Sequence, residues 1–304
     1  MAFGVNEAQE TPGDIISTML IGGFAVFFGL RGIARRSKSP RTVGAVVLAV
    51  SVLTAVYAFE ESQENKNRPA LGEAWVVESV GVKLVPIAAG SFAMGSTNGR
   101  DNEKPVTQLT LTKPYWLGAT EVTQGQWEAI MGNNPSNFKG GNLPVEGVSY
   151  EDAMEFCRKL TERERAADRL PEGYAYTLPT EAQWEYACRA GTTGDYAGNP
   201  DAMGWYDGIS GKKTHEVGGK QANAWGLYDM HGNVWEWCLD WYAEKLPGGS
   251  VSDSKGPASG SDRVFRGGGW GNDAAYCRSA FRLRFSPGNR NGNLGFRLAL
   301  SSVP

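Results

Sequence analysis

The chain has 304 residues, of which 41% are apolar and 21% are charged, and its formal net charge at neutral pH is -3. These values are typical of a globular protein with a substantial core, and they lack the basic footprint that nucleic-acid binding requires. The 40 glycines, 15 prolines and 10 tryptophans indicate a loop-rich fold in which aromatic side chains supply much of the buried area. We therefore expect a globular protein without a nucleic-acid partner.

The first sixty residues contain two apolar segments, at about 15–31 and 42–59, joined by a connector that contains Arg35, Arg36 and Lys38. Because basic residues stay on the cytoplasmic side, the pattern predicts a two-helix transmembrane hairpin over residues 1–60. The protein would then be integral to the inner or plasma membrane, in contact with lipid, with its C-terminal domain extracytoplasmic (periplasmic). The alternative is a signal sequence cleaved after Val56–Ala58, which would release a soluble domain.

Residues 61–82 begin with the polar run Ser62–Pro69 and are interpreted as a linker, because such a composition buries too little apolar surface to fold alone. Residues 83–304 contain no internal repeat and no second linker, so we predict a single α+β domain with a high loop content. Alternating apolar residues predict strands within Lys83–Gly95 and Thr107–Thr112, and a terminal strand at Leu294–Leu300.

Three helices are predicted from the capping-box pattern, in which an N-cap hydroxyl is followed three residues later by a side chain that can cap back. The pairs are Thr123 with Gln126, Ser149 with Asp152, and Thr180 with Gln183. The second and third helices each carry one cysteine, Cys157 and Cys188, among their apolar residues.

Six segments, in order, resemble the formylglycine-generating enzyme, or sulfatase-modifying factor, family, and they span nearly all of 83–300. They are Gly90–Gly95, Glu121–Gln124, Pro144–Ser149, Leu178–Ala187, Gly226–Trp237 and Asn293–Arg297. The resemblance implies a loop-rich variant of the C-type-lectin-like fold.

Members of the family oxidise a sulfatase cysteine to formylglycine, with copper(I) held by two thiolates. Laid on the family pattern, Gly269 stands in place of a serine, Asn272 replaces the first cysteine, and Tyr276 and Cys277 match the second motif. A neutral amide cannot replace a thiolate as a ligand of copper(I), so bound copper is not expected. Cys277 and Tyr276 would be catalytic only if a sulfur ligand came from elsewhere in the chain.

The loss of the copper pair leaves Cys277 without a family role, and Cys238 is its natural partner. In an oxidising compartment we expect two disulfides, Cys238 with Cys277 and Cys157 with Cys188, from the predicted topology and the even number of cysteines. The alternative for Cys157 and Cys188 is that both are buried small apolar side chains.

The resemblance also implies a structural calcium site. The positions that match its ligands are Asp229, Glu236 and the main chain of Gly232 and Val234, and hard oxygen ligands in a turning loop suit calcium. Iron-dependent relatives need clustered histidines. The chain has only His215 and His231, which the pattern indicates are hydrogen-bonded structural residues.

Exposed aromatic and polar residues near the altered copper motif predict a contact surface. Its members are Trp270, Asn272, Asp273, Tyr276, Phe281 and Phe285. The run Phe281–Asn293 is also similar to Asn-rich loops in lectin-like variable proteins of diversity-generating retroelements, which are binders, although ordinary bacterial family members share it.

Two functions remain open at this point. The favoured one is a membrane-anchored extracytoplasmic protein that has lost the copper chemistry and serves as a binding or structural subunit, with other membrane-protein subunits as partners. The alternative is an active formylglycine-generating oxidase.

Overall fold

The computed structural model describes residues 72–302, which fall within one compact unit, Asn65–Pro304. The hairpin predicted at 1–60, and the linker up to residue 71, lie outside the described residues. Within 72–302 every helix is too short or too polar to cross a bilayer.

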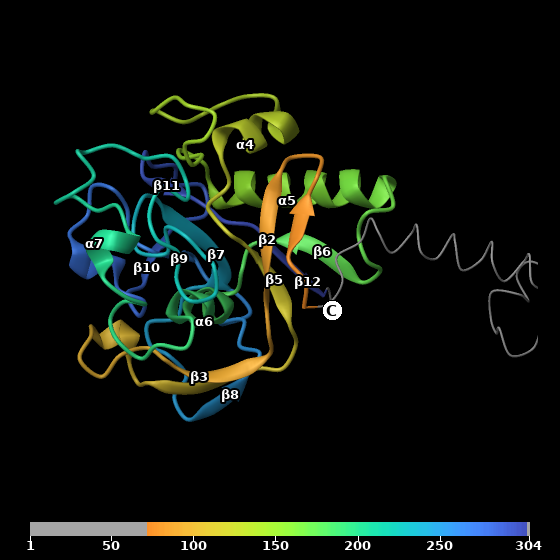
Figure 1. Cartoon of the computed structure of the whole chain (residues 1–304). Helices are drawn as coiled ribbons and strands as arrows, with labels where there is room; N and C mark the ends of the chain where they lie inside the picture. The colour runs from red at the N-terminus through yellow and green to blue at the C-terminus, as the bar shows by residue number, and fades with distance from the viewer. Residues whose placement is uncertain (1–71, 303–304) are drawn as a thin grey trace, which may run out of the picture. The chain divides into compact units, whose positions relative to one another are not determined.

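Three β-sheets form the framework of the domain (Figure 1). The largest is antiparallel throughout, in the order β1-β2-β5-β12-β6. Its strands are β1 (Trp75–Val77), β2 (Val82–Ile87), β5 (Tyr115–Gly118), β12 (Ala299–Ser302) and β6 (Tyr174–Thr177). Strand β12 lies between β5 and β6, so the sheet is continuous only through this strand from the end of the described residues.

The two smaller sheets have the orders β10-β9-β7-β11 and β3-β4-β8. The first contains β7 (Trp235–Trp241), β9 (Arg263–Arg266), β10 (Leu283–Phe285) and β11 (Leu294–Gly295), and the second contains β3 (Gly90–Met94), β4 (Thr107–Leu111) and β8 (Ser250–Ser252). The helices are α4 (Gln124–Met131), α5 (Tyr150–Ala166), α6 (Glu181–Arg189) and α7 (Pro200–Met203), with 3-10 turns η1 (Asp101–Glu103) and η2 (Ala274–Cys277). Helix α5 lies across the large sheet, whereas α6 contacts β3, β7 and β9 (Figure 1).

The three predicted capping boxes are present. In α4, α5 and α6 the N-cap side chain accepts the N3 amide, and the N3 side chain accepts the N-cap amide. Each box satisfies two otherwise unpaired donors, which fixes the first residue of the helix. The helix starts could therefore be located from the sequence.

The domain begins before the boundary predicted at residue 83. Strand β1 occupies part of the predicted linker, with Trp75 opposite Leu84 and Val77 opposite Val82. The side chain of Val77 is fully buried in the core. The short strand β1 could not be predicted from the sequence, because it follows the polar run Ser62–Pro69 and was included in the linker.

The predicted terminal strand Leu294–Leu300 is divided between two sheets. Strand β11 pairs in parallel with β7, whereas β12 pairs with β5 and β6. All residues from Leu294 to Leu300 are buried, so the alternation of apolar and polar residues does not mark an exposed face. The polar member, Arg297, lies inside the protein, where it bonds to a carboxylate.

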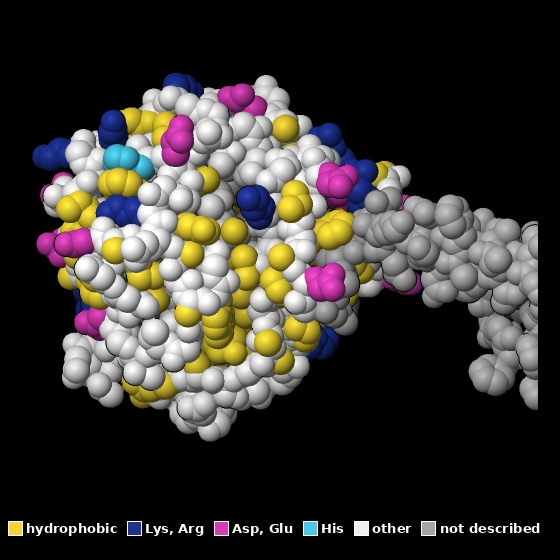
Figure 2. All heavy atoms as spheres, viewed as in Figure 1, with side chains coloured by type: hydrophobic (Ala, Val, Ile, Leu, Met, Phe, Trp, Pro, Cys, Tyr) yellow, Lys and Arg dark blue, Asp and Glu magenta, His cyan; other side chains and the backbone are white. Residues whose placement is uncertain are grey.

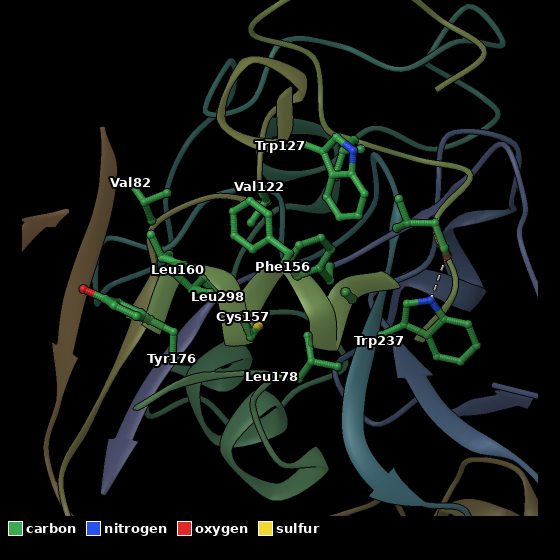
Figure 3. Packing of buried hydrophobic residues seen from close by; sticks show 14 of the residues in the cluster. Val82, Val122, Trp127, Phe156, Cys157, Leu160, Tyr176, Leu178, Trp237 and Leu298 are labelled. Atoms are coloured by element: carbon green, nitrogen blue, oxygen red, sulfur yellow. Dashed lines mark hydrogen bonds between the residues drawn. The ribbon is translucent and has the colours of Figure 1, made fainter. Parts of the chain in front are cut away.

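Two clusters of buried apolar side chains form the core. The first surrounds α5 and contains Trp127, Phe156, Cys157 and Trp237, whose indole Nε1 donates to the carbonyl of Val148 (Figure 3). Trp127 and Phe156 are stacked, with ring centroids 5.6 Å apart. Large aromatic rings thus supply much of the buried area, as the composition indicated.

All four cysteines are buried, free thiols, so neither predicted disulfide is present. Cys157 belongs to the core cluster around α5, whereas Cys188 and Cys238 belong to the second cluster, around α6. Cys277 follows a loop, with its Sγ packed against Gly268. The predicted Cys157–Cys188 pair assumed that cysteines on these two helices would share one core, but α5 and α6 face different cores. Of the other pair, Cys238 lies on β7 in the cluster around α6, whereas the thiol of Cys277 packs against the turn at Gly268.

Candidate functional site

The segment that carries the family's copper motif is a loop and not a strand. Strand β9 ends at Arg266, and Gly267 and Gly268 follow with φ angles of +100° and +77°. These left-handed conformations favour glycine and end the extended backbone. A Cβ on Gly268 would lie 2.3 Å from Sγ of Cys277, so any side chain at position 268 would clash with the thiol.

Cys277 is fully buried at the end of η2. Burial raises the pKa of its thiol to about 12. Because the thiolate is the form that attacks substrates and binds metals, a neutral thiol enclosed by protein is inert. The position that matches the second copper ligand therefore carries a buried thiol.

Asn272 is held by hydrogen bonds on three sides. Its side-chain Oδ1 accepts a hydrogen bond from the indole Nε1 of Trp235 at 2.8 Å. Its main-chain amide donates to the carbonyl of Gly269, and its main-chain carbonyl accepts from the amide of Asp207. The side chain is fixed toward Trp235 and acts as a structural hydrogen-bond acceptor. In place of a soft ligand, the motif carries a bond that ties the loop to β7.

The loop Trp205–His215 contacts the loop that contains Trp270 and Asn272. The hydroxyl of Ser210 donates to the carbonyl of Trp270, and the ring of His215 stacks on Trp205 with centroids 3.7 Å apart. The loop positions Trp270 and Asn272, because Ser210 and the amide of Asp207 bond to their carbonyls.

The predicted contact surface is only partly exposed. Asp273 is exposed and caps η2, and Tyr276 is half-buried beneath the guanidinium of Arg100, 5.3 Å from the ring centroid. Phe281 is only 2% exposed and packs under Tyr276, with ring centroids 4.9 Å apart. Phe281 therefore supports this surface from below and does not belong to it.

The aromatic residues at the two ends of the predicted surface are half-buried. Trp270 packs edge-on against Phe138 and donates its Nε1 to the carbonyl of Gly292, and Phe285 stacks on Phe265. On the face of the molecule drawn in Figure 2, lysine and arginine side chains stand apart from one another among apolar and acidic ones.

His231 is fully buried, and the main chain uses both of its ring nitrogens. Nε2 accepts the amide of Ala197 at 3.0 Å, so Nδ1 carries the proton that it donates to the carbonyl of Cys277 at 2.9 Å. Burial lowers the pKa of the ring to about 4. His231 is a neutral structural residue with no lone pair left for a metal.

Three buried carboxyl groups, of Glu121, Asp229 and Glu236, surround the buried guanidinium of Arg297. Arg297 forms two hydrogen bonds of 2.6 Å with Glu236, and Glu236 also accepts the Nε1 of Trp184 at 2.6 Å. One positive charge therefore faces three potential negative charges. The cluster carries excess negative charge unless a proton or a cation offsets it.

The electrostatics of the cluster reflect this excess. Burial raises the pKa of Asp229 to about 6, and the nearby Glu236 adds to the shift. Burial and the neighbouring Asp229 also raise the pKa of Glu121 well above its usual range. Oδ1 of Asp229 is buried without a hydrogen-bond partner, although Oδ2 accepts the amide of Gly218 at 2.7 Å.

The predicted calcium ligands fit a cation in part. The unpartnered Oδ1 of Asp229 is a suitable donor, but Glu236 is largely occupied by Arg297 and Trp184. Sequence reasoning missed Glu121, which approaches the amide of Val234 and bonds weakly to Asn233. Within residues 72–302 no three acidic, histidine or cysteine side chains converge as a metal site, so any calcium site here needs main-chain oxygens.

The domain combines three sheets, capped helices and long loops, and buried carboxylate–guanidinium pairs connect them. This arrangement is that of a sulfatase-modifying-factor type of domain. Residues 77–302 match the family model of the sulfatase-modifying factor enzyme 1-like domain. The chain belongs to this family.

Three relatives illustrate its range. The chain is 38% identical to the solved structure of variable protein 1 of Treponema denticola, with a TM-score of 0.68, covering 75% of this chain and 98% of that one. It is 30% identical to a chaperone protein LppX of Paenibacillus barcinonensis, over 72% of this chain and 89% of that protein. It is 32% identical to the formylglycine-generating enzyme of Mus musculus, over 66% of this chain but only 54% of that enzyme.

Protonation of His231 should destabilise the domain in mild acid. The folded pKa of about 4 lies below the ordinary value of 6.5. Stability from the neutral ring is therefore complete above pH 6.5 and is lost as the pH falls toward 4, by about 3 kcal/mol in total. Urea unfolding at several pH values measures the difference between the wild type and His231→Gln, which should shrink by this amount between pH 7 and pH 4.

The matched control is His215→Gln, which removes the other histidine and keeps His231, so the loss of stability in mild acid should persist in it. A constant difference between wild type and His231→Gln across this pH range would contradict the neutral assignment of His231.

Proposed function

We propose that the protein is a membrane-anchored, extracytoplasmic member of the family that has lost copper oxidation and serves as a binding or structural subunit. The observation that carries the proposal is the hydrogen bond from Nε1 of Trp235 to Oδ1 of Asn272. Asn272 is the residue that stands at the position of the first copper thiolate. The thiol of Cys277, at the position that matches the second ligand, is fully buried and stands without a second thiolate at position 272.

The range of relatives is compatible with a role outside oxidation. One relative is named a chaperone protein and another a variable protein, and neither name refers to an oxidase. The exposed part of the loop, with Asp273, Tyr276 and the half-buried Trp270, is the proposed contact surface for other membrane-protein subunits.

The alternative function is a formylglycine-generating oxidase, favoured by the 32% identity to the mouse enzyme. A second sulfur would then have to come from elsewhere in the chain, and Cys188 is a candidate, since its Sγ and the carbonyl of Cys277 both approach Nδ1 of His231. Cys188 is fully buried between His231 and Ser279, and burial raises the pKa of its thiol to about 12. These surroundings favour packing over metal binding.

The wild type should neither bind copper(I) tightly nor convert the cysteine of a sulfatase peptide to formylglycine. Restoring the missing ligand with Asn272→Cys should strengthen copper(I) binding at least a hundredfold, because two thiolates suit this ion. Competition with a copper(I) chelator measures binding, and mass spectrometry of the peptide measures oxidation.

Asn272→Ser is the matched control, since it loses the bond to Trp235 without adding sulfur, and it should not bind copper(I). Formylglycine formation by the wild type that disappears in Cys277→Ser would establish the oxidase in place of the proposed function.

We further propose a structural calcium ion beside Asp229, held by its Oδ1, by Glu121 or Glu236, and by main-chain oxygens of the loop at Gly232 and Val234. The support is the unpartnered, buried Oδ1 and the excess of carboxylates over guanidinium in the cluster. A divalent cation would offset that charge and complete the hydrogen-bonding needs of Asp229.

Calcium should therefore raise the melting temperature of the domain, and at a hundredfold excess over Kd the gain in free energy is about 2.7 kcal/mol. Asp229→Asn should abolish this gain while leaving stability in EDTA unchanged or higher, because it removes a buried charge. The exposed-site control Asp253→Asn should keep the full response. An absence of calcium-dependent stabilisation in the wild type would remove this part of the proposal.

The topology makes a separate prediction for the full-length chain. Alkaline phosphatase fused after Glu60 should be active, because the fusion point lies outside the cytoplasm, whereas a fusion after Arg36 in the basic connector should be inactive. Activity of the second fusion alone would reverse the proposed orientation. Recovery of the first fusion as a soluble, shortened product would support the cleaved signal sequence.

A further inference from the structure

We propose that the free edge of β3 binds an extended peptide segment of a partner protein by adding it as a further strand. Strand β3 is the edge strand of the sheet β3-β4-β8. The site is separate from the loop at 267–277, so this inference goes beyond the proposed function and does not depend on the loss of copper chemistry.

The pairing of the sheet fixes which main-chain groups of β3 lack a partner. In β4 the amide of Gln108 donates to Gly249 and the carbonyl of Thr110 accepts from Asp253, so both residues point toward β8. Leu109 must then point toward β3, where it lies opposite Phe92. Because strand residues alternate, the amides and carbonyls of Ser91 and Ala93 face the open edge, where no described residue bonds to them.

Two side chains of α6 cover the same edge at Gly95, two residues beyond Ala93. The amide of Gly95 donates to Oε1 of Glu185, and the carbonyl of Gly95 accepts Nη2 of Arg189, each at 2.9 Å. The two side chains form an ion pair on α6 and supply an acceptor and a donor, as a neighbouring strand would. The edge is therefore covered at Gly95 and open at Ala93 and Ser91, both of which are exposed.

A groove of about 590 Å³ runs beside this open edge. Its floor contains three half-buried rings, of Phe92, Tyr186 and Trp225, which pack on one another with centroid distances of 5.2 and 4.8 Å. Its far wall is the loop that follows α6, with Thr192 and Thr193. The rings offer an apolar place for one side chain of an incoming strand. The hydroxyl of Thr193 offers a hydrogen bond along its other edge, whereas that of Thr192 donates to the carbonyl of Arg189 and can only accept.

The chemistry of the groove favours a peptide over other occupants. Amide and carbonyl pairs that recur every two residues, about 6.6 Å apart, match the spacing of another strand. The charged residues of the lining are Asp195 and Arg189, whose guanidinium donors bond to Glu185 and to the carbonyls of Gly95 and Gly194. An anionic ligand would therefore meet an acidic side chain and a guanidinium already bonded within the protein, whereas an uncharged strand with alternating apolar side chains meets both the edge and the rings.

An array of synthetic heptapeptides tests the proposal, with Val, Ile, Leu, Phe or Tyr alternating with Thr, Ser or Lys. The folded wild-type domain should bind a subset of the array. Ala93→Pro should weaken that binding at least tenfold, because proline removes the outward amide and costs no bond to β4. Ala93→Thr is the matched control that keeps the amide, and it should bind as the wild type does.

Two further measurements keep the test decisive. Should Ala93→Pro fail to fold, Trp225→Ala removes one ring of the groove without altering β3, and it should also weaken binding at least tenfold. N-methylation of the best peptide, one residue at a time, should abolish binding at alternate positions only, because only alternate amides of an added strand face β3.

Three results would overturn the proposal. The first is a peptide result without dependence on the edge: either no peptide of the array binds, or the wild type and Ala93→Pro bind the same peptides equally. The second is binding of oligosaccharides that depends on Trp225 but not on Ala93→Pro, which would make the groove a glycan site. The third is a wild-type dimer in sedimentation that Ala93→Pro converts to a monomer without any peptide binding, which would make a second copy of the chain the occupant.

Discussion

The buried pair formed by Glu236 and Arg297 is the interaction on which the rest of the domain depends. It joins β7 to the segment between β11 and β12, and Arg297 also donates to the carbonyls of Gly118 and Tyr228. One side chain thus holds together the large sheet, the β7 sheet and the loop of buried carboxylates. Removing one member of such a pair leaves an uncompensated buried charge, at a cost of about 3 to 5 kcal/mol. The pair lies beside the segment from Leu294 to Leu300, whose residues are all buried.

That framework separates fold from chemistry. The loop that carries Asn272 and Cys277 is anchored by Trp235 on β7 and by main-chain bonds from neighbouring loops, none of which involves a metal. Exchange of a thiolate for an amide therefore changes what the loop can bind without removing the bonds that hold its shape. A binding role needs only the exposed residues of the loops, which a rigid scaffold presents in either case.

Local signals in the sequence were reliable wherever the governing interaction lies within a few residues. The capping boxes at Thr123, Ser149 and Thr180 place three helices correctly, because each box is complete within four residues. The motif segments gave the family, and with it the loop-rich α+β fold. The missing thiolate at Asn272 was equally visible, since it depends only on residue identity.

Contacts between distant segments could not be obtained in this way. Cys157 and Cys188 do not pair because α5 and α6 face different cores, and the residues from Leu294 to Leu300 are divided between the β7 sheet and the large sheet. Glu121 joined the carboxylate cluster from more than a hundred residues away in the sequence. The sequence by itself determined the family and the helix starts, since these follow from residue types and short spacings. Only the tertiary structure decided which thiols and carboxylates meet and which strand edge stays open, because those depend on packing between segments far apart in the chain.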